Sequence, residues 1–197
     1  MSLYNTEISR GSLMPLESKR VAALLLTNPD QATWEQVIEV ENILQKKTVT
    51  TAIRQSNLIR KRLETLDATA WKLITERESE VANQLLFAAA IKQNKLLGDF
   101  MRNVYAFRQQ QLEPDITATN WEDFVTECAH HDPSVASWNI DTKRKILAGI
   151  VRILVEAKYL ANRNSMILTP RDLHPHVRQY LTSRNENFVL DCLERTK

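Results

Sequence analysis

The chain has 197 residues, a formal net charge of +2, and 43% hydrophobic and 25% charged residues. This length is enough to bury a sizeable core in one domain or two small ones, and so small a net charge does not by itself indicate a nucleic-acid partner. The sequence holds only three glycines and six prolines. This composition favours long helices joined by short connections and leaves little scope for a glycine-rich phosphate loop. We therefore expect an all-α protein with a compact multi-helix globular fold.

The compartment can be predicted from the N-terminus, the apolar runs and the cysteines. The N-terminal MSLYNTEISRG has no apolar run, and the longest uncharged apolar stretch covers only residues 81–91. That stretch is too short for the roughly 20 residues of a membrane helix. Cys128 and Cys192 lie far apart, outside any CxxC motif, as expected for buried thiols in a reducing cytosol. These features predict a soluble cytoplasmic protein without a membrane partner.

The first third of the sequence predicts three helices. Pro15 suits the first turn of the first helix. Thr33 with Gln36 forms a capping-box pattern that opens a second, shorter helix. Residues 45–48 then form a turn, and a basic helix continues to about Leu66.

This basic helix has one apolar side and one polar side. Apolar residues recur at three- and four-residue steps from Val49 to Leu66, so one stripe should face the core. A helix of this kind after a shorter helix and a turn is typical of a helix-turn-helix, whose second helix enters the DNA major groove. A solvated charged face on an ordinary bundle helix would give the same pattern. The candidate DNA-binding residues of this unit, at about residues 33–66, are Lys46, Lys47, Thr50, Arg54, Asn57, Arg60, Lys61 and Arg62.

Residues 79–111 are apolar on more than one face, which predicts buried core helices with a break at Asn94 or Gly98. The sequence Glu113-Pro114-Asp115 is the expected boundary between subdomains at residues 1–112 and 116–197.

The second subdomain repeats the helix-turn-helix pattern at about residues 119–157. Thr119 with Glu122 forms a capping box, and Asp141 can cap a later amphipathic helix. The first turn of that helix holds Lys143, Arg144 and Lys145, the remaining candidate DNA-binding residues. Cations at a helix N-terminus oppose the helix dipole, and a bound phosphate would remove that conflict. Residues 158–169 could form the β-hairpin wing of a winged helix-turn-helix, or two extended connections.

We assign no catalytic residue, no metal site and no cofactor. Pro114-Asp115 and the later Glu156-Ala157-Lys158 match the PD…ExK nuclease motif in residue type but not in expected structure. That chemistry needs carboxylates that converge on a metal from strand ends, whereas Asp115 is expected in a loop and Glu156 at a helix end. The histidines at 130–131, 174 and 176 are better explained as surface or capping residues than as metal ligands.

The whole sequence resembles the BrxA family of the bacteriophage-exclusion (BREX) defence systems. The resemblance rests on GSLMPLESKRVAALLL (11–26), NILQKKTVTTAIR (42–54), LIRKRLETL (58–66), QLLFAAAIKQNKLLGDF (84–100), WEDF (121–124) and LVEAKYL (154–160). It implies an all-helical accessory protein that binds double-stranded DNA without enzymatic activity, beside other BREX components. In the family pattern, glycine is commoner at the position of Lys158.

Three functions remain open from the sequence. We favour a monomeric, non-enzymatic module that binds double-stranded DNA through two helix-turn-helix units. The alternative is a helical scaffold for protein–protein interaction, whose basic face meets an acidic partner. A nuclease has the least support.

Overall fold

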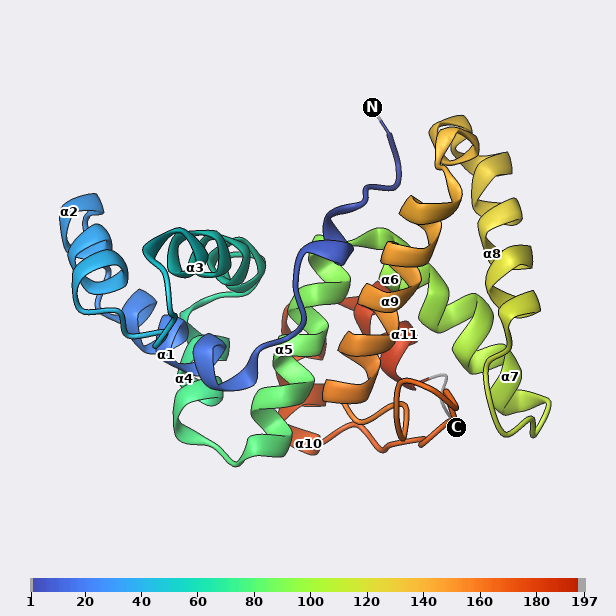
Figure 1. The fold of residues 1–197 in the computed structure, drawn as a ribbon. Helices are drawn as coiled ribbons and strands as arrows, with labels where there is room; N and C mark the ends of the chain where they lie inside the picture. Colours follow the sequence, from blue (N-terminus) through green and yellow to red (C-terminus); the bar gives the residue numbers. More distant parts are fainter. Residues whose placement is uncertain (1, 195–197) are drawn as a thin grey trace. The chain divides into compact units, whose positions relative to one another are not determined.

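The structure, a computed structural model, describes residues 2–194. As expected, the fold is all-α, and β-structure in the described residues is limited to isolated bridges. None of the described helices is both long and apolar enough to cross a membrane. The chain divides into two compact units: an N-terminal unit, Leu13–Gln93, and a C-terminal unit that combines Met1–Ser12 with Asn94–Lys197. The ribbon in Figure 1 follows each of them in chain order.

The N-terminal unit is built around helices α1, α3, α4 and α5. Helix α1 packs on α3, α4 and α5, and α3 also packs on α5 and η2. Ile59, Leu63 and Ile74 are fully buried between them, and the Trp71 indole donates a hydrogen bond of 2.8 Å to the Leu63 carbonyl. The helical segments are α1 (Pro15–Leu26), α2 (Gln31–Glu35), the π-helix η2 (Gln36–Val40), α3 (Val49–Leu63), α4 (Ala68–Glu76) and α5 (Ser79–Gln93).

The C-terminal unit is built around a run of short helical segments that follows Asn94. Phe100 packs edge-on against Phe124, with ring centroids 5.3 Å apart, and the Tyr105 hydroxyl donates to the Tyr159 carbonyl at 2.8 Å. The segments are η1 (Glu7–Arg10), α6 (Lys95–Phe100), the π-helix η3 (Met101–Tyr105), α7 (Ala106–Gln110), α8 (Ala118–His131), η4 (Pro133–Ser137), α9 (Ile140–Glu156), α10 (Pro175–Ser183) and α11 (Asn187–Glu194).

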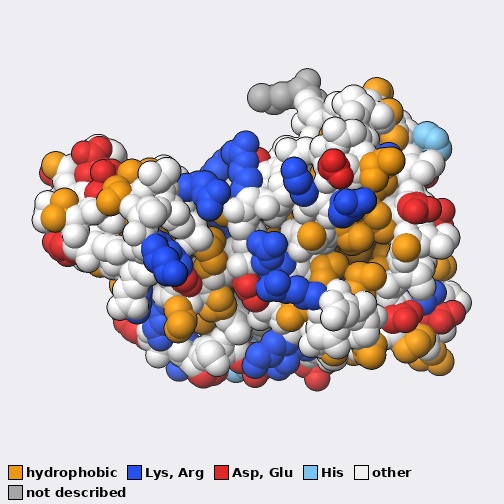
Figure 2. All heavy atoms as spheres, viewed as in Figure 1, with side chains coloured by type: hydrophobic (Ala, Val, Ile, Leu, Met, Phe, Trp, Pro, Cys, Tyr) orange, Lys and Arg blue, Asp and Glu red, His pale blue; other side chains and the backbone are white. Residues whose placement is uncertain are grey.

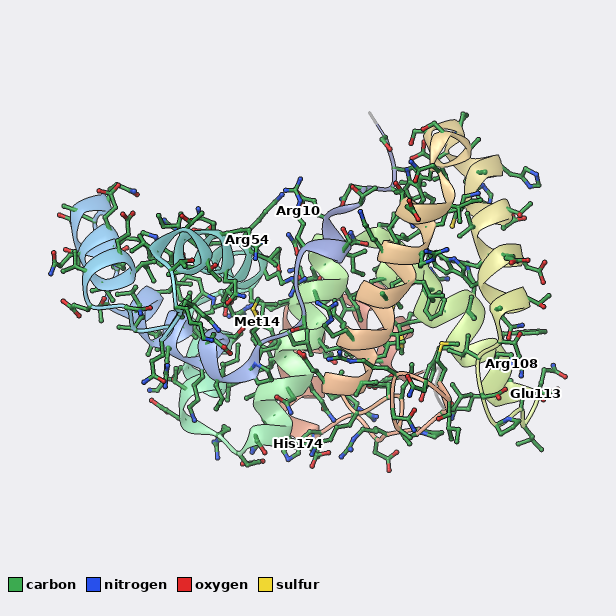
Figure 3. The ribbon with its side chains drawn as sticks, viewed as in Figure 1. Arg10, Met14, Arg54, Arg108, Glu113 and His174 are labelled. Atoms are coloured by element: carbon green, nitrogen blue, oxygen red, sulfur yellow. The ribbon has the colours of Figure 1, made fainter. Side chains whose placement is uncertain are left out.

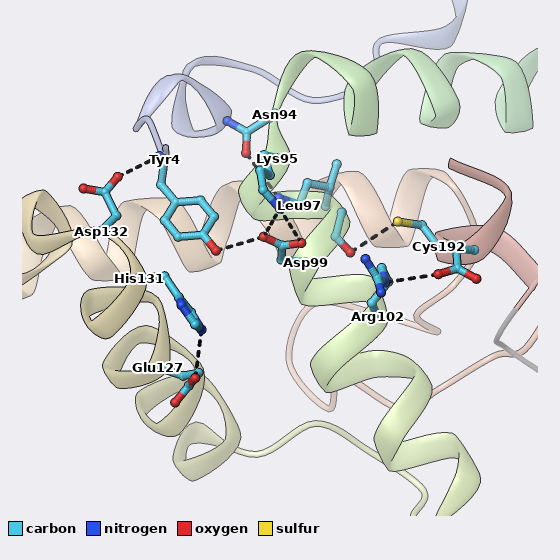
Figure 4. A network of polar contacts seen from close by, with 12 residues as sticks. Tyr4, Asn94, Lys95, Leu97, Asp99, Arg102, Glu127, His131, Asp132 and Cys192 are labelled. Carbon is cyan, nitrogen blue, oxygen red and sulfur yellow. Dashed lines mark hydrogen bonds and ion pairs between the residues drawn. The ribbon is translucent and has the colours of Figure 1, made fainter. Parts of the chain in front are cut away.

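A buried polar network joins the first residues of the chain to this unit (Figure 4). The Tyr4 hydroxyl donates to Asp99 Oδ2 at 2.8 Å, and Lys95 Nζ reaches both oxygens of the same carboxylate. The backbone N–H of Tyr4 donates to Asp132 Oδ2 at 2.9 Å. Tyr4 is therefore held by hydrogen bonds from both its backbone and its side chain within the C-terminal unit.

The division between the units does not fall at the expected boundary. The predicted helix break at Asn94 is confirmed: Asn94 has extended backbone angles, and its side chain caps α6 by accepting from the Leu97 N–H at 3.2 Å. The two units divide at this cap, between Gln93 and Asn94. Residues 113–115 lie within the C-terminal unit, where Arg108 pairs with both Glu113 and Asp115.

Three predicted helix caps lie downstream of the real ones. Asp30 caps α2, Thr117 caps α8 in a capping box with Asn120, and Asn139 caps α9. Thr33, Thr119 and Asp141, which we expected at these positions, are already inside the helices. Each real cap is an upstream polar residue in extended conformation whose side chain accepts a first-turn N–H, which is what a cap requires.

Residues 159–169 form a hairpin-like loop with single bridges, and we call this segment the 159–169 loop. Ala161 N–H donates to the Ile167 carbonyl and Thr169 N–H to the Tyr159 carbonyl, both at 2.9 Å. The Leu168 N–H instead pairs with the Pro114 carbonyl at 2.8 Å. Lys158, just before the loop, has φ of 64°, a left-handed conformation that favours glycine.

Candidate nucleic-acid interface

The turn before α3 is closed by its own side chains. Asn42 Oδ1 accepts from the Lys46 N–H at 2.9 Å, and Asn42 Nδ2 donates to the Lys46 carbonyl at 2.8 Å. Thr48 then caps α3 by accepting from the Thr51 N–H at 3.2 Å. Positive φ angles at Asn42 and Gln45 bend the chain between the two helices. The start of α3 is therefore fixed by local hydrogen bonds.

Helix α3 separates a buried side from an exposed side, as its periodicity predicts. Ala52, Ile59 and Leu63 are almost fully buried. On the polar side, one row of side chains is exposed along its whole length, and Figure 3 labels Arg54 in that row. The row consists of Thr50, Arg54, Asn57 and Lys61.

Lys47, Arg54 and Asn57 carry polar groups that are available to a ligand. All three are exposed, and none of their side chains forms a hydrogen bond or ion pair with another residue in the described part of the chain. Their charge and hydrogen-bonding capacity are thus not used within the protein.

Three other predicted residues of this helix and its turn are engaged inside the N-terminal unit. Lys46 forms an ion pair with Glu17 of α1 at 2.5 Å. Burial raises the pKa of Glu17, but the hydrogen bond and charge of Lys46 outweigh it, so the net pKa lies below its usual value.

Arg60 and Arg62 also contact the protein. Arg60 lies over the Trp34 ring, 4.5 Å from its centroid, and pairs with Glu64 at 2.7 Å. Arg62 is only 5% exposed and donates to Gln93 of α5 at 3.0 Å. Arg62 lies beside the buried stripe because it follows Ile59 by three residues. It is therefore not part of the exposed surface.

The connection before α3 differs from that of a compact helix-turn-helix. Helix α2 runs directly into the π-helix η2, and η2 packs on α3. Residues 41–48 connect them, a longer segment than the 3–4 residues or so of a typical helix-turn-helix turn.

The second basic cluster lies in the first turns of α9. Arg144 and Lys145 are exposed, whereas Lys143 is half-buried. Arg144 lies 3.5 Å from Asp141, and both side chains are about three-quarters exposed, at 75% and 74%. Helix α8 packs on η3 and η4, while α9 packs on η1. The arrangement therefore presents two neighbouring cations on an exposed turn of α9.

Two arginines that sequence analysis missed lie near this cluster. Arg152 of α9 and Arg163 of the 159–169 loop line a cavity with Arg144. Figure 2 shows Lys and Arg side chains beside exposed apolar side chains over α9. The four-residue steps from Arg144 through Ala148 to Arg152 are a signal that could have identified this face.

Residues of the rejected catalytic motifs have structural roles here. Asp115 pairs with Arg108 at 3.2 Å, and His174 caps α10 by accepting from the His176 N–H. Burial raises the pKa of the Cys128 thiol to about 11 and that of Cys192 to about 12, so neither is a ready nucleophile at neutral pH. Within residues 2–194, no group of three or more His, Cys, Asp or Glu side chains could hold a metal ion.

The comparisons with known proteins agree over almost the full length. The profile of the BrxA family matches residues 2–185. A BREX protein BrxA from Paramagnetospirillum magneticum is 36% identical over 191 residues, which cover 97% of this chain and 96% of that protein. A second BREX protein BrxA, from Escherichia coli O9:H4, is 33% identical over 184 residues, with 93% of this chain and 86% of that protein covered.

A solved structure has the same fold. It is the crystal structure of an uncharacterized protein from Magnetospirillum magneticum, and it superposes with a TM-score of 0.88 at 35% identity. The superposition covers 96% of this chain and 97% of the other.

Proposed function

Because this chain belongs to the BrxA family of BREX phage-defence proteins, we propose that it is a non-enzymatic accessory protein that binds double-stranded DNA. It would do so beside other components of the BREX system. The observation that carries this proposal is the exposed row of α3, with Lys47 at its N-terminal end.

The residue types on this row suit a duplex. Arg pairs bidentately with guanine and Asn with adenine in the major groove, and the first half of a recognition helix is the part that reaches base edges. Arg54 lies in that half of α3, and Asn57 lies one residue past the midpoint of the helix at Ser56. Lys47 precedes the helix, where an ammonium group meets phosphate more readily than bases.

Duplex DNA is a better match than a single strand. Single-strand binding depends on exposed aromatic rings on which bases stack. In this protein Trp34, Phe100 and Trp121 are at most 6% exposed and belong to the core, and the exposed Phe107 is a single ring on α7, outside the basic row. The exposed polar row of α3 can form hydrogen bonds and ion pairs but offers no stacking platform.

A competition experiment tests the proposal. A labelled duplex is bound at low salt and challenged with unlabelled duplex, single-stranded DNA and RNA. We expect duplex to compete best, and log affinity to fall linearly with log salt concentration. Arg54→Ala/Asn57→Ala should weaken binding, whereas Lys72→Ala on α4, an exposed lysine outside the row, should not. The proposal fails if the unmodified protein does not bind duplex at low salt, or if single strands or RNA displace the duplex more effectively than unlabelled duplex does.

A further inference from the structure

The C-terminal unit carries a small groove with an apolar floor and a basic rim. A cavity of about 290 Å³ lies between α9 and the 159–169 loop. Its floor is formed by Leu147, Ala148, Val151 and Met166, and the side chains on its rim are the three arginines Arg144, Arg152 and Arg163. No carboxylate lines this cavity. We call it the arginine groove.

The charge on the rim is largely uncompensated. The side chains of Arg152 and Arg163 form no ion pair or hydrogen bond with any residue between 2 and 194. Arg144 faces only Asp141, and an exposed pair at 3.5 Å is weak in water. An anionic group would therefore find three guanidinium groups that need not first give up a strong partner.

The floor restricts what the anion can be. Val151 is 6% exposed and lies at the base of the cavity with apolar neighbours. A phosphate gains nothing from apolar atoms and loses hydration against them. The volume is at the lower limit of the roughly 300–1,000 Å³ of small-molecule pockets, which suits a single large side chain. A leucine or phenylalanine with acidic neighbours would use both the floor and the rim.

We infer that the arginine groove binds an acidic segment of a partner protein, with one large apolar side chain on the floor and flanking Asp or Glu side chains paired with the arginines. Arginine suits this role because its planar guanidinium pairs bidentately with carboxylates and is weakly hydrated. An apolar core with a polar, solvent-accessible rim is the usual anatomy of a protein–protein interface. The inference does not rest on DNA binding by α3, because the N-terminal unit contributes no residue to the groove.

Methionine-methyl NMR can observe this groove directly. The sequence has four methionines. Met14 and Met101 are buried, whereas Met166 lines the groove. The probe is the peptide acetyl-Asp-Glu-Leu-Phe-Glu-Asp-amide, and a control peptide has Ser in place of Leu and Phe. Full-length protein with ¹³C-labelled methionine methyl groups is titrated with each peptide, and Met166→Leu assigns the signal.

We expect the apolar acidic peptide to shift the Met166 signal saturably and the serine peptide to bind at least about tenfold more weakly. Arg152→Ala/Arg163→Ala should abolish the shift while leaving the affinity for duplex DNA through α3 unchanged. Arg54→Ala/Asn57→Ala, the matched pair in the N-terminal unit, should leave the peptide titration unchanged.

Three outcomes would overturn the inference. Equal binding of the two peptides would reduce the groove to a non-specific cationic surface. A Met166 shift with duplex DNA but not with the peptide would assign the groove to nucleic acid. If the Met166 signal does not shift at millimolar peptide, the groove does not bind such a segment. If the unmodified protein binds the peptide but fails to bind duplex DNA, that result would contradict the DNA proposal and not this one.

Discussion

At the scale of single residues, neighbouring lysines with the same chemistry have different surroundings. Lys46 and Lys47 are adjacent in the turn before α3, yet Lys46 is paired with Glu17 and Lys47 is exposed without a partner in the described residues. A contact to DNA costs Lys46 its ion pair and costs Lys47 nothing comparable. Their contributions to binding should therefore differ.

We predict that Lys47→Ala weakens binding to all duplexes alike and reduces the slope of log affinity against log salt by about one unit. Lys46→Ala should change that slope less, and it should lower the free energy of unfolding by up to about 1 kcal/mol, as is usual for a pair near the surface. Salt titrations and thermal melts of the two variants measure both effects. Equal slopes for the two variants would contradict this prediction.

Asp132 provides a residue-scale prediction about pH. Its carboxylate accepts from the Tyr4 N–H at 2.9 Å, from the Ser134 N–H at 3.0 Å and from the Ser2 hydroxyl at 2.8 Å. These hydrogen bonds, with that from Tyr4 first, hold the pKa of Asp132 well below its usual value of 3.8. A depressed folded-state pKa means that its stabilisation is complete above the unfolded-state pKa and is lost as the pH falls below it.

We therefore expect the melting temperature to decline as the pH drops below about 4, and Asp132→Asn to make that decline shallower while lowering stability at pH 7. Asp141→Asn serves as the control, because Asp141 is 74% exposed. A parallel pH profile for the Asp132 variant and the unmodified protein would show that Asp132 does not anchor residues 2–4.

These residue environments set the limit of prediction from sequence. The apolar periodicity from Val49 to Leu66 predicts which side of α3 is exposed, because a helix repeats every 3.6 residues. It does not show that three other candidates, Lys46, Arg60 and Arg62, have partners within the N-terminal unit. Their partners Glu17, Trp34 and Gln93 lie far away in the sequence. Only the fold brings them together.

At the scale of elements, α9 is fixed by its close approach to η1. A Cβ atom added at Gly149 would lie 2.6 Å from the carbonyl oxygen of Ile8, which is backbone and cannot rotate away. The absence of a side chain at this position lets the first residues of the chain pack directly on the helix. The φ angle of Gly149 is not positive. The position therefore requires glycine because of the close packing and not because of its backbone conformation.

We predict that Gly149→Ala destabilises the protein by about 1–2 kcal/mol. Overpacking costs about 1–3 kcal/mol, and the better helix propensity of alanine returns up to about 1 kcal/mol. Chemical denaturation measures the net change. Lys145→Ala, on an exposed position of the same helix, should stay within about 0.5 kcal/mol of the unmodified protein. A stabilised Gly149→Ala protein would mean that η1 does not pack on α9.

Elements were predictable where the signal is local. The helices and the break at Asn94 follow from apolar periodicity and from a side chain that can cap. Pro114 ends regular structure and so predicts a division at residues 113–115, yet Arg108 ties that segment to the C-terminal unit through Glu113 and Asp115. The arginine groove cannot be predicted from the sequence, because Arg163 belongs to a loop whose position the sequence does not specify.

At the scale of the whole molecule, each unit carries an exposed group of candidate DNA-binding residues. In the N-terminal unit it is the row of α3 with Lys47, and in the C-terminal unit it is the start of α9 with Arg144 and Lys145. The number of phosphates that the full protein neutralises sets the slope of log affinity against log salt. Salt dependence can therefore reveal how many units bind without knowledge of their relative positions.

We predict that Arg144→Ala/Lys145→Ala weakens duplex binding and reduces the salt slope by about one unit per lost phosphate contact, with little change in stability because both side chains are exposed. Arg54→Ala/Asn57→Ala should cost affinity unevenly among duplex sequences if α3 reads bases, by about 1–3 kcal/mol for each good pair.

If both units contact the same duplex, the variant that combines all four substitutions should show both effects added together. If only one unit binds, one of the double variants will behave like the unmodified protein. Unchanged salt slopes in both double variants, with intact melting temperatures, would contradict binding through either basic group.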